Sequence, residues 1–78
     1  MSDMTLDGVI VEKIVKIDAI EVGIDDNERL AVFSGGLGLG YDIKHRSDIE
    51  IVSLILTHAH CSKETARKIY EWGIKQIS

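Results

Sequence analysis

Residues 8–24 read GVIVEKIVKIDAIEVGI and contain nine β-branched residues. β-Branched side chains suit a pleated surface, and an apolar residue at every second position marks one face of a strand. The alternation is clear over residues 20–24, whereas Lys13 interrupts the run before it. We therefore expect two strands separated by a break near residues 16–18. A helix over residues 9–20 is the rival interpretation, because part of the same run also fits a helical period.

The following residues continue a β-rich half. The acidic group DDNE at residues 25–28 predicts a turn, because Asp and Asn side chains bond their own backbone. Residues 30–34 then form the returning strand. In residues 35–44, GGLGLGYDIK, the apolar residues occupy alternate positions and therefore share one face of a strand; they are Leu37, Leu39, Tyr41 and Ile43.

The opposite face of that last strand is expected to carry only glycine, at Gly36, Gly38 and Gly40. Glycine weakens strands, and within a strand it often marks the close approach of a ligand or of another backbone. Two interpretations follow. The glycine face is a docking groove, or it is covered from inside the domain, with the first helix as the expected occupant.

Residues 47–77 carry the signals of two helices. Ser47 and Glu50 form a capping box, so the first helix begins at residue 48 and extends to about residue 60. Its apolar arc is broad, which predicts a nearly surrounded, central helix. Ser62 begins the second helix, in which apolar residues recur at steps of three and four.

We therefore expect a single α+β domain over residues 1–78. Its β-rich half, residues 8–44, forms a small antiparallel sheet of three or four strands. Its second half, residues 47–77, forms an αα-hairpin that packs on the sheet.

The net charge of −4 is unevenly distributed along the chain. Residues 1–40 hold eight acids and three bases, which gives −5, and residues 41–78 hold five acids and six bases, which gives +1. Binding to nucleic acid is disfavoured, because phosphate contacts need clustered Lys and Arg. The single cysteine, Cys61, excludes an internal disulfide and favours a cytoplasmic protein. The longest apolar run is residues 54–56, so no membrane span is expected.

The run LILTHAH at residues 54–60 resembles the metal motif of the metallo-β-lactamase family, Thr-His-x-His-x-Asp-His after an apolar strand. His58 and His60 match its first two histidines, but Ser62 and Lys63 stand where the next acid and histidine belong. Zinc sites use three or four protein ligands. The sequence therefore predicts no metal, with His58 buried and His60 facing solvent.

No cofactor or catalytic site is expected either. The glycine run at residues 35–40 lacks the third glycine of a dinucleotide fingerprint and has no Gly-Lys-Ser/Thr. Cys61 has a histidine neighbour, but a nucleophile needs a base within hydrogen-bond reach and a third orienting group. We therefore predict that the chain is not an enzyme.

The outer side of the second helix is the expected partner-binding surface, with Lys63, Arg67, Lys68 and Trp72. Trp and Arg are enriched among the residues that dominate protein interfaces. The leading hypothesis is a small non-enzymatic regulatory or inhibitory protein that binds another macromolecule, most readily a protein. It is similar in size and acidity to the inhibitors of phages and mobile elements.

The alternative is a helix-turn-helix transcriptional regulator. Five residues fall on the apolar positions of that pattern, namely Ile55, Ala59, Cys61, Ala66 and Ile69, and its major-groove positions are Ser62, Lys63, Glu64, Arg67 and Lys68. Leu56 and His60 depart from the pattern, where a small residue and glycine are usual. A third class is the subunit of a homo-oligomer formed by sheet-edge pairing.

Overall fold

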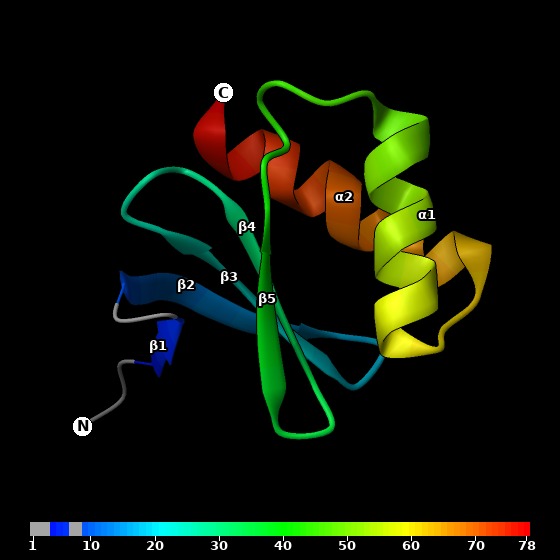
Figure 1. The fold of residues 1–78 in the computed structure, drawn as a ribbon, viewed down its shortest axis with the longest axis horizontal. Coiled ribbons are helices and arrows are strands. Elements are labelled where there is room, and N and C mark those ends of the chain that lie inside the picture. The colour runs from blue at the N-terminus through cyan, green and yellow to red at the C-terminus, as the bar shows by residue number, and fades with distance from the viewer. Residues whose placement is uncertain (1–3, 7–8) are drawn as a thin grey trace.

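The computed structural model describes residues 4–6 and 9–78 and contains five strands followed by two helices (Figure 1). The strands are β1 (Met4–Leu6), β2 (Val9–Ile17), β3 (Ile20–Asp25), β4 (Leu30–Ser34) and β5 (Leu37–Tyr41), and the helices are α1 (Asp48–Ala59) and α2 (Lys63–Ile77). The predicted α+β class is confirmed, with an antiparallel sheet followed by two helices that pack on it. The short β1 comes in addition to the three or four strands that the sequence predicted.

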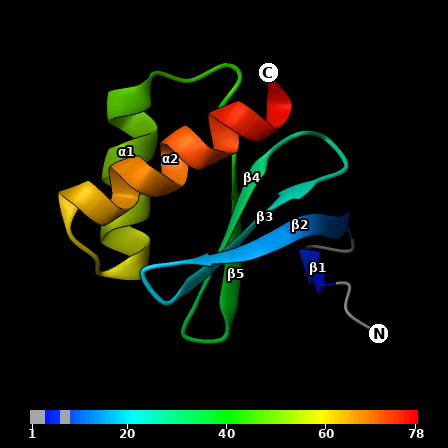
Figure 2. The ribbon, with the colours of Figure 1, turned by 180° about the vertical axis from the view of Figure 1, so that it is seen from behind.

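The sheet is an antiparallel meander in which each strand pairs with the next in the chain. Its two outer strands, β1 and β5, approach one another without pairing. The sheet is therefore strongly coiled, and β5 runs across the direction of β2 and β3 in both views (Figures 1 and 2).

The predicted break in residues 8–24 is the turn between β2 and β3, where Asp18 and Ala19 have φ of 50° and 71°. Lys13, which interrupts the alternation, has φ of 56° and lies at a register shift between Glu12 and Val15. Such a bulge inserts an extra residue and bends the strand. The rival helix over residues 9–20 is wrong, because β-branched pairing across the sheet outweighs the local helical period.

The β3–β4 and β4–β5 turns follow from their sequences. The Asp25 carboxylate accepts hydrogen bonds from the backbone N–H of Asn27 at 2.9 Å and of Arg29 at 2.8 Å, as predicted for an acidic turn. Gly35 and Gly36 link β4 to β5 with φ of 60° and 82°. Positive φ at both central residues is what a two-residue hairpin of type I′ requires.

The main core lies between one face of the sheet and the two helices. Val22, Leu30 and Val32 of the sheet are fully buried there, against Ile51 and Ile55 of α1 and Ala66 and Ile69 of α2. A smaller cluster on the opposite face joins Val11 and Ala31, with Ile14 and Phe33 beside them. The sheet thus has apolar packing on both faces, but helices on only one.

Both helices begin at a serine cap. Ser47 Oγ accepts from Glu50 N at 3.3 Å, and Ser62 Oγ accepts from Thr65 N at 3.1 Å. The other half of the predicted capping box is replaced, because the Glu50 carboxylate pairs with Arg46 at 2.6 Å. Neither helix of the described residues is long and apolar enough to cross a membrane.

The prediction that the first helix is nearly surrounded is wrong. Ile49 and Leu54 of α1 are 74% and 44% exposed, and only Ile51, Val52 and Ile55 are buried. The reason is the placement of α1, which stands across α2 at one side of the molecule (Figures 1 and 2). Core neighbours cover one side of α1, and its other side faces solvent.

Candidate functional site

The predicted partner-binding residues lie in α2, but they do not form one positive patch. Lys63 is exposed at the first position of the helix. Arg67 Nη1 lies 3.6 Å from Asp48 Oδ2 at the start of α1, and Lys68 Nζ lies 3.3 Å from Asp18 Oδ2 in the β2–β3 turn. Two of the three cations therefore face a carboxylate of the same chain, one at the start of α1 and the other in the β2–β3 turn.

Contacts of Trp72 and Asp18 attach α2 to the rest of the domain. Trp72 is half-buried and packs against the main core. The Asp18 carboxylate accepts a hydrogen bond from Thr65 Oγ1 at 2.7 Å. This bond, followed by the contact with Lys68, lowers the pKa of Asp18. These side chains hold α2 in place, which leaves them less available to a partner.

The predicted glycine face is only partly formed. Gly36 lies in the β4–β5 turn, and only Gly38 and Gly40 belong to β5. They pair with Phe33 and Ala31, so they share the sheet face of the smaller cluster. The expectation that α1 covers this face is wrong, because both helices pack on the opposite face, where the leucines and Tyr41 of β5 point.

The prediction for His60 is confirmed, whereas His58 is less buried than predicted. His60 is exposed and ends α1 with φ of 52° and ψ of 44°, and His58 is half-buried. The His58 ring lies 6.5 Å from the Tyr41 ring. Within residues 4–6 and 9–78, no three His, Cys, Asp or Glu side chains gather in a way that suits a metal. Burial raises the pKa of the half-buried Cys61 thiol, which disfavours a nucleophilic thiolate.

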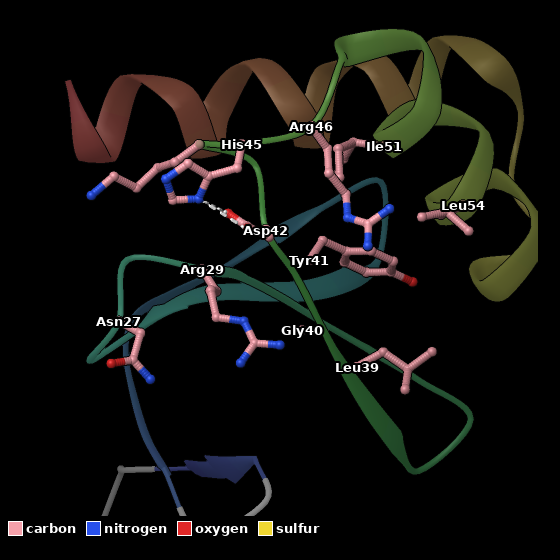
Figure 3. A pocket seen from close by; sticks show the side chains of 11 residues that line it. Asn27, Arg29, Leu39, Gly40, Tyr41, Asp42, His45, Arg46, Ile51 and Leu54 are labelled. Atoms are coloured by element: carbon pink, nitrogen blue, oxygen red, sulfur yellow. Dashed lines mark hydrogen bonds and ion pairs between the residues drawn. The ribbon is translucent and has the colours of Figure 1, made fainter.

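A concave surface of about 760 Å³ lies between β5 and α1, and we call it the β5–α1 groove (Figure 3). Its apolar end is formed by Leu39, Gly40, Tyr41, Ile51 and Leu54. Its polar end lies beside the β3–β4 turn and the loop before α1, and is formed by Asn27, Arg29, Asp42, Lys44, His45 and Arg46. The groove therefore joins exposed hydrocarbon to a group of cations.

Two leucines make the apolar end unusual for a small domain. Leu39 is 46% exposed and Leu54 is 44% exposed, and Figure 3 shows their side chains on the same side of the groove. Leu37, one alternate position before Leu39, is 68% exposed. The period-two pattern correctly placed Leu37, Leu39 and Tyr41 on one face, but α1 covers only Tyr41.

Ion pairs hold most of the polar end. Lys44 Nζ lies 2.7 Å from Glu28 Oε1, and His45 Nδ1 lies 3.0 Å from Asp42 Oδ1. The hydrogen bond with Glu28 raises the pKa of Lys44. Burial opposes ionisation of Asp42, but the hydrogen bonds and charge of His45 outweigh it and lower the pKa of Asp42.

Arg29 and Arg46 supply the accessible cations of the groove. Arg46 pairs with Glu50, and its guanidinium extends toward Tyr41 (Figure 3). Within the part of the chain that the structure describes, the Arg29 guanidinium has no ion-pair partner. An arginine of this kind is suited to a carboxylate, which it can bind through two parallel hydrogen bonds.

A pair of buried polar atoms lies beneath the apolar end. The Tyr41 hydroxyl and His58 Nε2 are both buried, and neither has a hydrogen-bond partner within the described residues. Burial, with a further contribution from Cys61, raises the pKa of Tyr41 to about 12. Tyr41 therefore stays protonated, and its ring contributes an apolar surface to the groove.

The sequence interpretation missed this groove. Its one available signal was the basic run Lys44-His45-Arg46 in an otherwise acidic chain, directly before the capping serine. Arg29 is distant in sequence and joins the site only through the β4–β5 pairing, since Leu30 lies opposite Tyr41.

Comparisons with protein-family models, with curated proteins and with solved structures found no match to this chain. Among the described residues, the β5–α1 groove is the concave surface that combines exposed leucines with accessible arginines.

Proposed function

We propose that this chain is a small non-enzymatic regulatory or inhibitory protein of the cytoplasm that acts by binding another protein through the β5–α1 groove. One observation carries the proposal: Leu39 and Leu54, each nearly half exposed, meet in a groove whose other end is cationic. An apolar centre with a polar rim is typical of protein-binding surfaces. The single half-buried thiol of Cys61 supports a reducing compartment.

The groove favours a partner segment with one or more apolar side chains followed by a carboxylate. The apolar side chain would cover Leu39 and Leu54, and the carboxylate would meet Arg29. Arg46 can also bind this carboxylate at a small cost in free energy, because it would give up an exposed ion pair with Glu50, and such pairs contribute about 0–1 kcal/mol. A regulatory protein of this kind acts by binding alone and needs no catalytic residues at this surface.

The arrangement of reactive groups supports a binding role over catalysis. The exposed His45–Asp42 pair lies at the polar end, and the groove lining includes no Ser, Thr or Cys beside it. Cys61 lies outside the lining, and the Tyr41 hydroxyl is buried. A nucleophile and its base therefore do not come together in the groove.

Affinity capture from the native lysate, with two matched variants, tests the proposal. Leu54→Glu places a charge in the groove, and Ile49→Glu places the same charge on the same helix outside the groove lining. We expect Leu54→Glu to weaken capture of the partner about tenfold or more, and Ile49→Glu to leave it unchanged. Capture that survives Leu54→Glu but is lost in Trp72→Ala would move the binding surface to α2.

Three structural features favour the DNA-binding alternative enough to keep it as a second candidate. The connection between α1 and α2 is short, and the helices cross one another (Figures 1 and 2). His60 takes the left-handed conformation of the glycine that this turn usually has. Ile55, Ala66 and Ile69 are buried between the elements, as the helix-turn-helix pattern requires.

A further inference from the structure

The loop that joins β5 to α1 bounds one end of the β5–α1 groove. The two elements that form the groove follow one another in the chain, so residues 42–47 cross from one wall to the other at this end. Figure 3 shows this loop above the rest of the lining. The loop residues that line the groove are Asp42, Lys44, His45 and Arg46. A partner segment that runs along the groove from its leucines therefore has to stop or turn away at this loop.

Arg29 lies at the same closed end. In the β4–β5 pairing Leu30 lies opposite Tyr41, so Arg29 comes level with Asp42, the first residue of the loop. Arg29 is exposed, and Figure 3 shows its guanidinium beside β5 among the lining residues. A guanidinium presents several N–H donors in a planar fork and no acceptor. The closed end therefore offers a binding site for an anionic group.

The ion pairs of the polar end leave one positive charge uncompensated. Each of the other charged side chains of the lining has a partner; the pairs are Lys44–Glu28 at 2.7 Å, His45–Asp42 at 3.0 Å and Arg46–Glu50 at 2.6 Å. Among residues 4–6 and 9–78, no carboxylate pairs with Arg29. One such cation matches one carboxylate, whereas a phosphorylated side chain would bring about −1.5 to −2 charges.

The exposed leucines lie at a defined distance from this cation. Leu39 precedes Asp42 by three residues, which corresponds to about 10 Å along a strand. An extended partner chain covers the same distance with about three residues. An apolar side chain about three positions before the bound carboxylate would therefore lie against Leu39 and Leu54, which form the apolar end of the groove.

The surrounding charges favour a single carboxylate over an acidic segment. Asp26 and Glu28 flank Asn27 of the lining in the chain, Glu50 lies beside Arg46, and the whole chain carries −4. Further acids in the partner would be repelled by these groups. A free C-terminus supplies one carboxylate with no residue after it. It therefore satisfies both the charge of Arg29 and the closure of the groove by the loop.

We infer that the β5–α1 groove binds the free C-terminus of its partner protein. The terminal carboxylate binds Arg29 through two parallel hydrogen bonds, and an apolar side chain among about the last four residues covers Leu39 and Leu54. Capture of a C-terminal carboxylate is a recurring mode of peptide recognition. The inference rests on the proposed function, because it names the part of the partner that the groove recognises.

Peptides with two kinds of C-terminus test the inference. Short random peptides are attached to a surface through their N-termini in two matched sets, one with a free C-terminal carboxylate and one with a C-terminal amide. We expect the labelled wild-type protein to select peptides of the first set that carry an apolar residue near the end. Amidation of these peptides should weaken binding about tenfold or more in fluorescence anisotropy, because a neutral amide cannot replace the carboxylate on Arg29.

Three variants assign the carboxylate to its site. Arg29→Gln should bind the acid and amide forms equally, because it lacks the positive charge. Lys16→Gln is the matched control, since it removes the same charge from an exposed position of β2 outside the groove lining, and it should keep the preference for the acid. Leu54→Glu should bind neither form. The melting temperature of each variant shows that it is folded.

The outcomes separate this inference from the proposed function. Equal binding of the two forms by the wild type, selection of no peptide at all, or a preference that survives Arg29→Gln would overturn the inference. Peptides that bind equally as acid and amide, but not to Leu54→Glu, would show that the groove binds an internal segment, and the proposed function would stand. Peptide binding that Leu54→Glu leaves unchanged would contradict both. With no selected peptide, capture from the native lysate still decides the proposed function.

Discussion

Within the strand of residues 37–41, large side chains and glycines alternate, and each set lies on its own face of the sheet. The leucines and Tyr41 point toward the helices and bond to β4, whereas Gly38 and Gly40 point to the other face and direct their backbone outward. The same two-residue period produces both effects. Substitution of Leu39 therefore alters the groove, while substitution of Gly38 or Gly40 alters the opposite face, beside the smaller cluster.

Gly23 is the glycine with the strictest steric requirement among those whose surroundings the structure gives. A Cβ atom there would lie 2.5 Å from Val11 Cγ1 and 2.9 Å from the Glu12 carbonyl oxygen. We predict that Gly23→Ala destabilises the domain by about 1–3 kcal/mol through overpacking. Urea denaturation measures this loss.

A conformational control separates packing from backbone effects. Gly35 has φ of 60°, and a Cβ atom added there would have no neighbouring atom within 4 Å. Asn tolerates this left-handed conformation. Gly35→Asn should therefore change the free energy of unfolding much less than Gly23→Ala. A loss for Gly23→Ala no larger than that for Gly35→Asn would contradict the steric requirement at position 23.

At the scale of elements, α2 is held to the β2–β3 turn by one carboxylate. Asp18 accepts from Thr65 and contacts Lys68, and these contacts lower its pKa below the usual value of 3.8. A pKa that is lower in the folded state means that the ionised form favours folding. This contribution is present above the unfolded pKa and is lost as the pH falls through the folded pKa.

We predict that Asp18→Asn lowers the melting temperature at about pH 7, and that this loss shrinks at acidic pH as the carboxyl group of Asp18 becomes protonated. Asn keeps the left-handed backbone that residue 18 requires, so the difference reports the charge. Asp26→Asn, in the exposed β3–β4 turn, changes the net charge equally and should have a smaller effect at both pH values. An equal loss for Asp18→Asn at both pH values would contradict a role for the carboxylate charge.

The elements themselves could be predicted, because each depends on local pattern. The break at Asp18, the acidic turn after Asp25 and the serine caps follow from neighbouring residues. The groove could not be predicted in this way. Alternation places Leu39 and Tyr41 on one face, but only the packing of α1 determines that Tyr41 is covered and Leu39 is not. The cations of α2 likewise appeared free in the sequence until the fold brought Asp18 and Asp48 beside them.

For the whole molecule, charge separates the protein-binding proposal from its DNA-binding alternative. The chain carries −4, and residues 1–40 carry −5 of the charge, from eight acids and three bases. α2 offers Lys63, Arg67 and Lys68 to a duplex, but carboxylates lie 3.6 Å from Arg67 and 3.3 Å from Lys68. DNA phosphates would have to displace both carboxylates, and the net negative charge of the domain would repel the duplex at the same time.

We therefore predict no measurable binding to duplex DNA at physiological salt. Each phosphate contact releases counterions, so three cations support only a shallow dependence on salt and a weak affinity. Fluorescence anisotropy with a labelled pool of duplexes measures the binding. Arg67→Ala tests the α2 surface, and Arg29→Ala removes the same charge at the groove, away from the helix pair. Sub-micromolar binding that falls steeply with salt, and that Arg67→Ala abolishes while Arg29→Ala does not, would make α2 a recognition helix. In that case the carboxylates of Asp18 and Asp48 would act as internal competitors that the phosphates of a specific site must displace.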